Sequence, residues 1–425
     1  MYRSFLLASA LATVFLSSAQ SYTHQVLVLN EGYFNFQTQL QEIPVTLGSY
    51  VPGTGVYQTV ATISDARFGN HVAVEGDFIF VAADQRLLKY DANTYTLLDE
   101  ATVPGIRRFA FRENEIVITL GEVGGLSHYC EVRDKNTFDL LYFIDGTTLP
   151  HSCEGVQVVG DKAYLAVNNG FDWANTVGKL GILDMTTGMW ETSLDLGPDG
   201  SNPENIMVDG DAIYAFNNKD FTGSSISKVS IASASLAYTT NVALSSGCGS
   251  SAKIGDRVYF MEYSQNVLNR YDIATNAVLD TLVGSPATYG LIDDPNNGVM
   301  YGTTTDFFSS GELHVMDYTG NILSTVAVGV SPGRLALDTR SSVGIDEKVG
   351  VAIGLFPNPA TGTLTIRTEG HEVGGNLSIS DAAGRTVMLV PASAFGVQDV
   401  FVGSLADGAY TVRLSNGSAA LFIKQ

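Results

Sequence analysis

The stretch Gly76-Asp77-Phe78-Ile79-Phe80 holds a pattern that returns along the chain: a Gly-Asp turn, then apolar residues and an aromatic ring. Full copies stand at Gly160–Tyr164, Gly210–Tyr214 and Gly255–Tyr259, and weaker copies at Arg112–Ile116 and Asn297–Tyr301. The spacing of roughly forty to fifty residues is typical of propeller and solenoid repeats. The repeat therefore predicts the architecture of most of the chain.

Each repeat divides into four short strands. In the copy around Gly160 we expect strands at 155–159, 163–167, 180–183 and 190–194. The last strand follows an Asp-centred turn, Asp184–Gly188. Asp and Asn side chains bond their own backbone in such turns and tolerate tight geometry. We interpret these turns as folding signals rather than as functional sites.

The repeats predict a closed ring. Six of them fit between about His71 and Pro332, and the segment His24–Ile63 supplies three more strands, at 25–29, 42–47 and 56–60. The missing fourth strand is expected at Arg334–Asp338, at the far end of the repeats. Joining the two ends in one sheet leaves no exposed sheet edge. We predict an all-β, seven-bladed β-propeller over residues 20–339.

The first 19 residues have the features of a secretory leader. Arg3 supplies a positive start, Phe5–Phe15 an apolar core, and Ser17-Ser18-Ala19 a small-residue cleavage site. No later segment approaches the roughly 20 apolar residues that a membrane-spanning helix needs. The sequence therefore predicts an exported protein with a signal peptide at 1–19 and no transmembrane segment.

Composition narrows the classes of partner. Of the 425 residues, 45% are hydrophobic and 16% are charged, which is typical of a globular chain long enough for more than one domain. The formal net charge is −21. A nucleic-acid partner needs a basic face for its phosphates, so this charge argues against nucleic acid.

The pattern changes after Thr339. We expect a linker at 340–351 and a small β-sandwich at 352–425, because 363–367, 377–380 and 409–414 alternate like half-buried strands. Four segments of this region resemble the sorting domain of proteins exported by the type IX secretion system: Leu355–Ala360, Ser380–Arg385, Leu405–Leu414 and Phe422–Lys424. The resemblance implies contact with that machinery and a secreted or surface-attached product of a Gram-negative bacterium.

The repeats are similar to surface-layer or YVTN-like seven-bladed propellers. More narrowly, Leu29-Asn30-Glu31-Gly32-Tyr33-Phe34 is similar to the opening segment of exported propellers, some of which capture cobalamin beside outer-membrane transporters. The strict Tyr-Val-Thr-Asn motif is absent, since Tyr164 is followed by Leu165-Ala166-Val167-Asn168. The resemblance implies the fold and leaves the cofactor unknown.

Chemistry is expected on the face that carries the loops between second and third strands. These loops are long and rich in aromatic residues, whereas the Gly-Asp turns on the other face are minimal. Rings with Asn and Asp between them suit stacking on a planar or amphipathic ligand, or on a glycan. The predicted ligand-binding residues are Asn30, Glu31, Tyr33, Phe34, Asn168, Phe171, Asp172, Trp173, Asp220, Phe221, Tyr263 and Phe307. The rings could instead pack under their own loops.

Two other functions remain as alternatives. Loop-face acids (Glu31, Asp172, Asp220, Glu262, Asp306) leave open an enzyme that degrades carbohydrate or peptide. No Gly-x-Ser-x-Gly motif is present and no catalytic residue is predicted. The same face could also serve as a protein-binding scaffold in a surface complex.

The cysteines, Cys130, Cys153 and Cys248, are too few for a disulfide framework. Cys153 and Cys248 are expected at equivalent inner-strand positions two blades apart, too far for a bridge. Cys130 and Cys153 each follow a histidine by two residues, so a Cys130–Cys153 disulfide or a soft-metal site are alternatives to buried core thiols. We predict core thiols and no metal site.

Overall fold

The computed structural model describes residues 20–219, 223–242, 246–342, 353–368, 376–391, 397–414 and 419–425. The expected leader, most of the expected linker, and the predicted site residues Asp220 and Phe221 lie outside these ranges. Ser21–Ser341 forms one compact unit, and Ser342–Gln425 belongs to a second. Each unit is described by itself.

The larger unit contains, among its described residues, seven four-stranded antiparallel sheets, here called blades and given from the inner to the outer strand. Blade 1 is β30 (Pro332–Ser342), β1 (Gln20–Asn30), β4 (Val45–Val51) and β5 (Val56–Ile63); blade 2 is β6 (Gly69–Glu75), β7 (Phe78–Ala83), β8 (Arg86–Asp91) and β9 (Leu97–Thr102). Blade 3 is β10 (Ile106–Arg112), β11 (Glu115–Leu120), β12 (His128–Asp134) and β13 (Leu140–Asp145); blade 4 is β14 (Cys153–Val159), β15 (Lys162–Val167), β16 (Lys179–Asp184) and β17 (Met189–Asp195). Blade 5 is β18 (Pro203–Asp209), β19 (Ala212–Asn217), β20 (Ser224–Ser230) and β21 (Ser235–Val242). Blade 6 is β22 (Ser246–Ile254), β23 (Arg257–Glu262), β24 (Val267–Asp272) and β25 (Ala277–Leu282); blade 7 is β26 (Gly290–Asp294), β27 (Val299–Thr304), β28 (Ser310–Met316) and β29 (Ile322–Val330).

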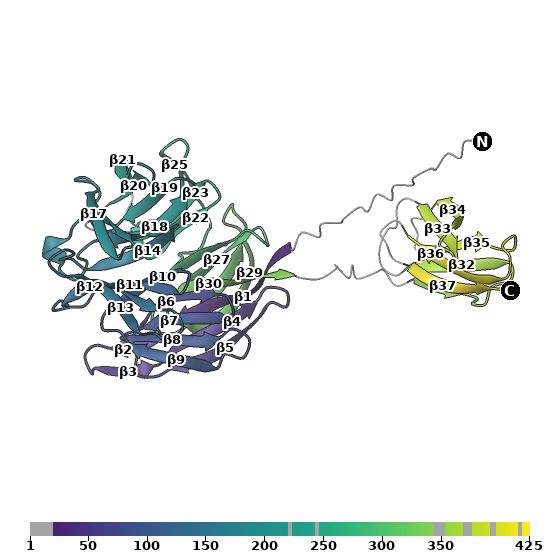
Figure 1. Ribbon diagram of the computed structural model, residues 1–425, viewed down its shortest axis with the longest axis horizontal. Coiled ribbons are helices and arrows are strands. Elements are labelled where there is room, and N and C mark those ends of the chain that lie inside the picture. The colour runs from purple at the N-terminus through teal and green to yellow at the C-terminus, as the bar shows by residue number, and fades with distance from the viewer. Residues whose placement is uncertain are drawn as a thin grey trace, which may run out of the picture. The chain divides into compact units, whose positions relative to one another are not determined.

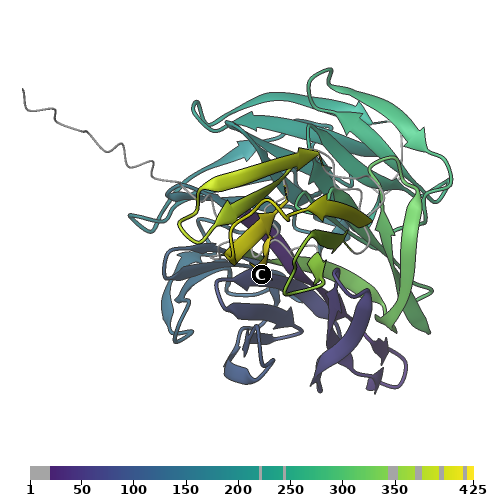
Figure 2. The ribbon, with the colours of Figure 1, turned by 90° about the vertical axis from the view of Figure 1, so that its right-hand side faces the viewer.

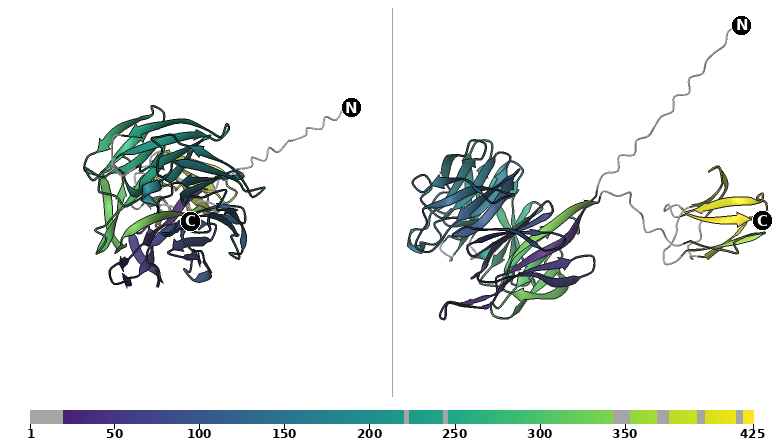
Figure 3. Two further views of the ribbon diagram at one scale, coloured as in Figure 1. Left: turned by 90° about the vertical axis from the view of Figure 1, so that its left-hand side faces the viewer. Right: turned by 60° about the horizontal axis from the view of Figure 1, so that its bottom comes forward.

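Hydrophobic clusters fill the spaces between neighbouring blades. The second strand of a blade is covered on both sides, so almost every residue of Phe78–Ala83 and of Ala212–Asn217 is buried. One cluster lies at each interface around the ring, and the cluster holding Tyr301 and Val28 joins blade 7 back to blade 1. Figures 2 and 3 show the blades in chain order around the ring. The predicted all-β propeller fold is confirmed, and the described residues of this unit form seven four-stranded sheets.

Closure of the ring uses both ends of the unit. β30 pairs with β1, so the strand expected at Arg334–Asp338 completes blade 1. The backbone N–H groups of Glu31 and Gly32 donate to the carbonyls of Ser331 and Val330, at 2.8 and 3.0 Å. Gln25 also donates to Asp338 at 2.9 Å. These contacts join chain segments some 300 residues apart without leaving a free edge.

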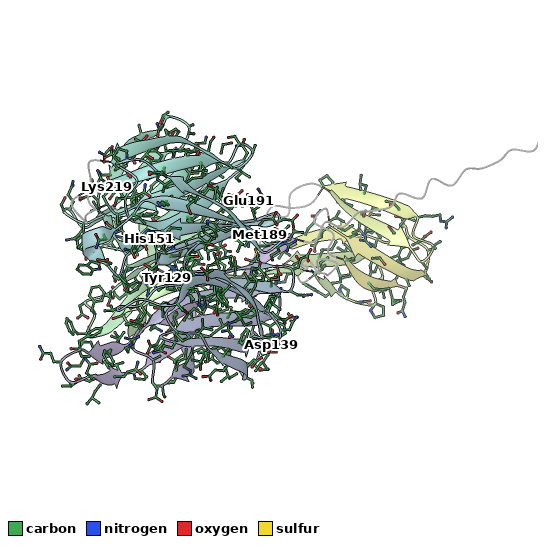
Figure 4. All side chains as sticks on the ribbon, turned by 60° about the vertical axis from the view of Figure 1, so that its left-hand side comes forward. Tyr129, Asp139, His151, Met189, Glu191 and Lys219 are labelled. Carbon is green, nitrogen blue, oxygen red and sulfur yellow. The ribbon has the colours of Figure 1, made fainter. Side chains whose placement is uncertain are left out.

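The topology sorts the connections onto two faces. The Gly-Asp turns and the Asp-centred turns lie on one, called the turn face; the loops between second and third strands and the links between blades lie on the other, called the loop face. Figure 4 shows Lys219, His151 and Tyr129 toward one face and Asp139, Met189 and Glu191 toward the other. The loops with predicted ligand chemistry therefore share a face.

One expected strand of blade 1 is misplaced. Residues 42–47 do not form a single strand, because β3 (Leu40–Ile43) pairs with β2 (Tyr33–Asn35) in a separate hairpin, and β4 begins at Val45. Pro44 stands between them and has no N–H to donate to a ladder. The hairpin is the long loop between the second and third strands of blade 1.

The smaller unit is a two-sheet β-sandwich (Figure 1). One sheet has the order β31 (Ile353–Phe356), β32 (Thr363–Thr368), β35 (Val397–Phe401), and the other β34 (Thr386–Pro391), β33 (Asn376–Asp381), β36 (Gly408–Arg413), β37 (Ala419–Lys424). Their inner faces enclose a core that includes Leu364, Ile379 and Phe422. Asn358 accepts the N–H of Ile423 at 2.9 Å, which holds the last strand against the start of the unit.

Cys130 and Cys153 are both unpaired and lie in the same core cluster between blades 3 and 4. The disulfide alternative is therefore not realised in this structure. Burial raises the pKa of both thiols above its ordinary value. Cys153 and Cys248 stand on inner strands of blades 4 and 6, two blades apart as expected, although the side chain of Cys248 lies outside the described residues.

Candidate functional site

A β-bulge recurs near the loop-face end of the inner strands. The register of the inner strand against the second strand shifts there in blades 2 to 6. A bulge leaves a residue unpaired and changes the direction of its side chain. The residues within these shifts include Asn70, Arg107, Arg108, Glu154 and Glu204. The bulges thus bring polar side chains toward the axis of the propeller, where the inner strands meet.

The centre of this axial cluster is an ion pair between blades 3 and 4. Arg107 binds Glu154 through two parallel hydrogen bonds, Nε to Oε2 at 2.8 Å and Nη2 to Oε1 at 3.1 Å. Arg108 reaches the same carboxylate more weakly, at 3.4 Å. The Glu154 side chain is only 6% exposed. Burial alone would raise the pKa of Glu154, but the charges of Arg107 and Arg108 outweigh it and hold this pKa at about 2.

Two further glutamates lie in the cluster with pKa values shifted the other way. Burial, and then the charge of Glu154, raises the pKa of Glu204 to about 7. Burial also raises the pKa of Glu31, although Arg334 and a hydrogen bond from Tyr289 act against it. The cluster thus holds three arginines, Arg107, Arg108 and Arg334, and three glutamates, of which only Glu154 has a lowered pKa.

Glu31 covers the axis from the loop face. Tyr289 donates to its Oε1 at 2.9 Å. Gly333, on the inner strand of blade 1, lies directly beneath, and a Cβ there would collide with Glu31 Oε1 and stand 2.8 Å from the Tyr289 ring. The absence of a side chain at Gly333 is therefore what lets Glu31 fold over the axis.

An aromatic cavity lies on the loop face between blades 7 and 1. It has a volume of about 470 Å³ and is lined by Glu31, Tyr33, Phe34, Phe36, Arg67, Phe68, Phe307, Phe308 and neighbouring backbone. The Tyr33 and Phe308 ring centroids are 5.4 Å apart, and those of Phe34 and Phe36 are 5.0 Å apart. The β2–β3 hairpin and the blade 7 loop thus converge, and four predicted residues, Glu31, Tyr33, Phe34 and Phe307, meet here.

The blade 7 loop is held in a strained conformation. Phe307 has a φ of +69°, in the left-handed region that bulky residues rarely adopt. Asp306 accepts the N–H groups of Phe308 and Ser309 at 2.9 and 2.7 Å, and these bonds keep its pKa at about 2. The Phe307 ring packs edge-on to Tyr289, with centroids 5.1 Å apart. Strain that is retained in this way is found preferentially at functional sites.

A second, more polar cavity adjoins the first. It has a volume of about 560 Å³, and its lining includes Glu122, Tyr129, His151, Phe171 and Asp172. Phe171 stacks on the Arg107 guanidinium at 5.1 Å, so this wall is also the outer side of the axial ion pair. Gly121 lies against the Phe171 ring, which leaves no room for a Cβ at that position.

A single ion-pair chain connects the two cavities. Arg67, in the aromatic cavity, binds Asp84 by Nε at 2.8 Å and Glu122 by Nη2 at 3.0 Å. Glu122 lines the polar cavity. The loop face therefore carries two adjoining hollows with a shared charged wall.

Several predicted site residues have other positions. Asn30 is fully buried and donates to Thr46 and Tyr57 within blade 1, and Asn168 is buried and accepts the N–H of Gly170. Neither residue lines the aromatic or the polar cavity, and their contact with a ligand stays a prediction. Trp173 and Tyr263 are 80% and 60% exposed on the loop face and line neither cavity.

Sequence reasoning missed the arginines of the axial cluster. Arg107 and Arg108 stand where neighbouring repeats carry Asn70, Glu154 and Glu204, and this run of polar residues on inner strands was the available signal. Their convergence depends on bulges and on ring closure, which no short motif encodes.

Comparison with known proteins bears on the smaller unit first. Residues 354–425 match the family described as "Secretion system C-terminal sorting domain". This is the sorting domain of type IX secretion. The chain is an exported protein. It is therefore destined for the cell surface or the surroundings of a Gram-negative bacterium, and the sorting domain implies interaction with the secretion machinery. Among the described residues, no helix is long and apolar enough to cross a membrane.

Comparison of whole structures bears on the fold alone. Hydrazine synthase of Kuenenia stuttgartiensis is similar at 13% identity and a TM-score of 0.54, over 81% of this chain and 99% of that chain. A chain of the mitotic checkpoint complex has 9% identity and a TM-score of 0.50, over 71% and 95%. BamB from Moraxella catarrhalis has 11% identity and a TM-score of 0.45, over 76% and 91%. The comparison with curated proteins gave no match.

Proposed function

We propose that this protein is an exported binding propeller that holds a small planar or amphipathic molecule, or a glycan, in the aromatic cavity of its loop face. The observation that carries the proposal is the convergence of six aromatic rings from the loops of blades 7, 1 and 2 around one hollow of about 470 Å³. This volume is within the ordinary range for small-molecule sites.

The cavity combines stacking surface with few polar groups. Phe307 and Phe308 keep 45% and 65% of their surface exposed, although each packs against another ring. Clustered exposed rings favour association with a flat or apolar ligand. Arg67 and Glu31 stand at the lining and supply the polar contacts that orient a bound molecule. The resemblance to cobalamin-capturing surface propellers makes corrinoids the first ligands to test.

A protein partner is the second candidate. Trp173 lines neither cavity and is 80% exposed on the loop face, and Phe36, in the wall of the aromatic cavity, keeps 66% of its surface exposed. Exposed aromatic anchors of this kind are typical of interface hot spots. In this case the loop face is still the binding surface, but it binds a protein rather than a small molecule.

The double variant Tyr33→Ala/Phe307→Ala tests the cavity. The panel of candidate ligands contains corrinoids, haem and glycans. A ligand that binds is expected to raise the melting temperature of wild type, because a ligand that binds only the folded state raises apparent stability. The double variant is expected to lose that response while keeping its unfolding transition, since both rings are partly exposed. The measurement is a thermal-shift titration followed by calorimetry.

Tyr263→Ala is the matched control, because Tyr263 is an exposed loop-face ring that lines neither cavity. It should bind like wild type. A ligand response that survives the loss of both Tyr33 and Phe307 would refute the aromatic cavity as the site. A response lost in Tyr263→Ala as well would indicate a broad face, as a protein partner needs.

Removal of residues 343–425 should prevent export to the surface. The sorting domain occupies 354–425, so the truncated chain lacks the element that contacts the secretion machinery. Fractionation of the producing bacterium followed by immunoblotting should find the truncated propeller in the cell envelope and not outside. Tyr263→Ala, with its sorting domain intact, should be exported normally. Equal surface delivery of both forms would show that the tail is dispensable.

A further inference from the structure

The axis of the propeller is hollow on the turn-face side of the axial cluster. Two cavities of about 470 and 340 Å³ lie there, and they share His71, Arg108, Gln157 and Asn205 in their linings. They therefore form one axial channel. The ion pair of Arg107 and the cover of Glu31 lie on the loop-face side, so the channel is separate from the aromatic cavity.

Two arginines at the inner end of this channel have donors to spare. A guanidinium carries five N–H donors. Among the described residues, Arg108 makes one long hydrogen bond, to Glu154 at 3.4 Å, and Arg334 makes one, to the Asn70 carbonyl at 3.1 Å. Both residues line the channel. Glu154 is already occupied by two shorter bonds from Arg107.

His71 adds a third donor. Its Nδ1 accepts the N–H of Phe109 at 3.2 Å. Burial, and then the charges of Arg108 and Arg334, keeps the His71 pKa well below its ordinary value, so the ring is neutral. A neutral imidazole that accepts at Nδ1 carries its proton on Nε2, which is then a donor.

Arg108 and Arg334 are the charged residues of the channel lining at this end, while Glu154 and Glu204 act on Arg108 from outside the lining. Both residues line the same cavity, and burial and the charge of Arg334 lower the pKa of Arg108 to about 10. The other charged groups of the lining lie nearer the turn face. Lys253 binds Asp209 at 2.9 Å, Asp293 accepts the hydroxyl of Tyr318 at 2.9 Å, and Glu75 binds Lys135 at 2.9 Å. These groups have partners of their own.

We propose that the inner end of the axial channel binds a small anion with carboxylate or phosphate oxygens, between Arg108 and Arg334. The fork of donors on arginine matches the paired oxygens of either group. His71 donates a third hydrogen bond, and Gln157 and Asn205 border the site. Access is from the turn face, toward which the lining extends to Lys253, Asp293 and Glu75.

Calorimetric titration of the full chain tests this proposal, with phosphate, sulfate and citrate as probes against chloride at equal ionic strength. The oxyanions should bind and raise the melting temperature, and chloride should not. If only citrate binds, the site is specific for carboxylates. If phosphate, sulfate and citrate all bind, the site accepts oxyanions in general. Arg334→Met should weaken Kd at least about tenfold, the usual value of a lost charge-assisted hydrogen bond.

A second variant, Gln157→Glu, tests the proposal even if Arg334→Met does not fold. It is nearly isosteric and places a carboxylate among the unsatisfied arginine donors. This variant should melt higher than wild type without added anion and should lose the anion response. The Tyr33→Ala/Phe307→Ala variant should bind the anions with a Kd within about twofold of wild type. The proposal is overturned if no oxyanion acts beyond chloride, or if Gln157→Glu responds like wild type.

Discussion

Glu154→Gln is expected to cost about 3 to 5 kcal/mol of unfolding free energy at neutral pH, the usual loss when one partner of a buried ion pair is removed. Glu154 holds Arg107 through two hydrogen bonds and Arg108 through a third. Glutamine keeps one acceptor but no charge, so both guanidinium groups would remain buried without a carboxylate. Urea unfolding of the full chain at pH 7.4 measures the loss, read from the transition of the larger unit.

The pH dependence gives a second check on Glu154. Its pKa in the folded protein, about 2, is below the ordinary value of 4.5, so its contribution is present above pH 4.5 and is lost as the pH falls toward 2. The variant should therefore approach wild-type stability in acid. Glu100→Gln is the control, because Glu100 forms a comparable two-bond pair with Arg86 at an exposed site. It should cost less than about 1 kcal/mol. Equal losses in the two variants would show that burial of the axial pair is unimportant.

Glu204→Gln should act in the opposite direction. The pKa of Glu204 in the folded protein, about 7, is above its ordinary value of 4.5. Ionisation of Glu204 is therefore unfavourable in the folded state, and stability falls as the pH rises from 4.5 through 7. Glutamine removes this cost, so the variant should exceed wild type by up to about 3 kcal/mol at pH 8.5 and match it near pH 4.5. Asn218 donates to this carboxylate, and the glutamine carbonyl can accept in its place.

Unfolding curves at several pH values separate the two glutamates. The free energy of unfolding of wild type should fall as the pH rises from about 5 through 7, because Glu204 ionises there. That of Glu204→Gln should not show this fall. A Glu204→Gln protein that is less stable than wild type at pH 8.5 would mean that Glu204 is an ionised partner of the arginines. An ionised Glu204 would offset the charges of Arg108 and Arg334, which would count against an anion in the channel.

The sequence went further for the fold than for the site. The Gly-Asp repeats predicted the blades, because they are a local periodicity of the chain. The unpaired strand after Pro332 predicted the closure of the ring, because a free sheet edge is unfavourable. The loop residues Tyr33, Phe34 and Phe307 do meet in one cavity. Asn30 and Asn168 hydrogen-bond within their own blades and lie outside that cavity, because a polar residue in a loop can equally bond its own blade.

The sequence by itself determined the β-propeller and the sorting domain, since turn chemistry, strand alternation and terminal motifs are local properties of the chain. Only the tertiary structure decided which loops adjoin and what occupies the axis. Arg107, Glu154 and Arg334 are separated by long stretches of sequence, and they meet because bulged inner strands from different blades converge as the ring closes. Interactions that depend on closure have no local pattern, so the charged centre and its open arginine donors could be seen only in the folded molecule.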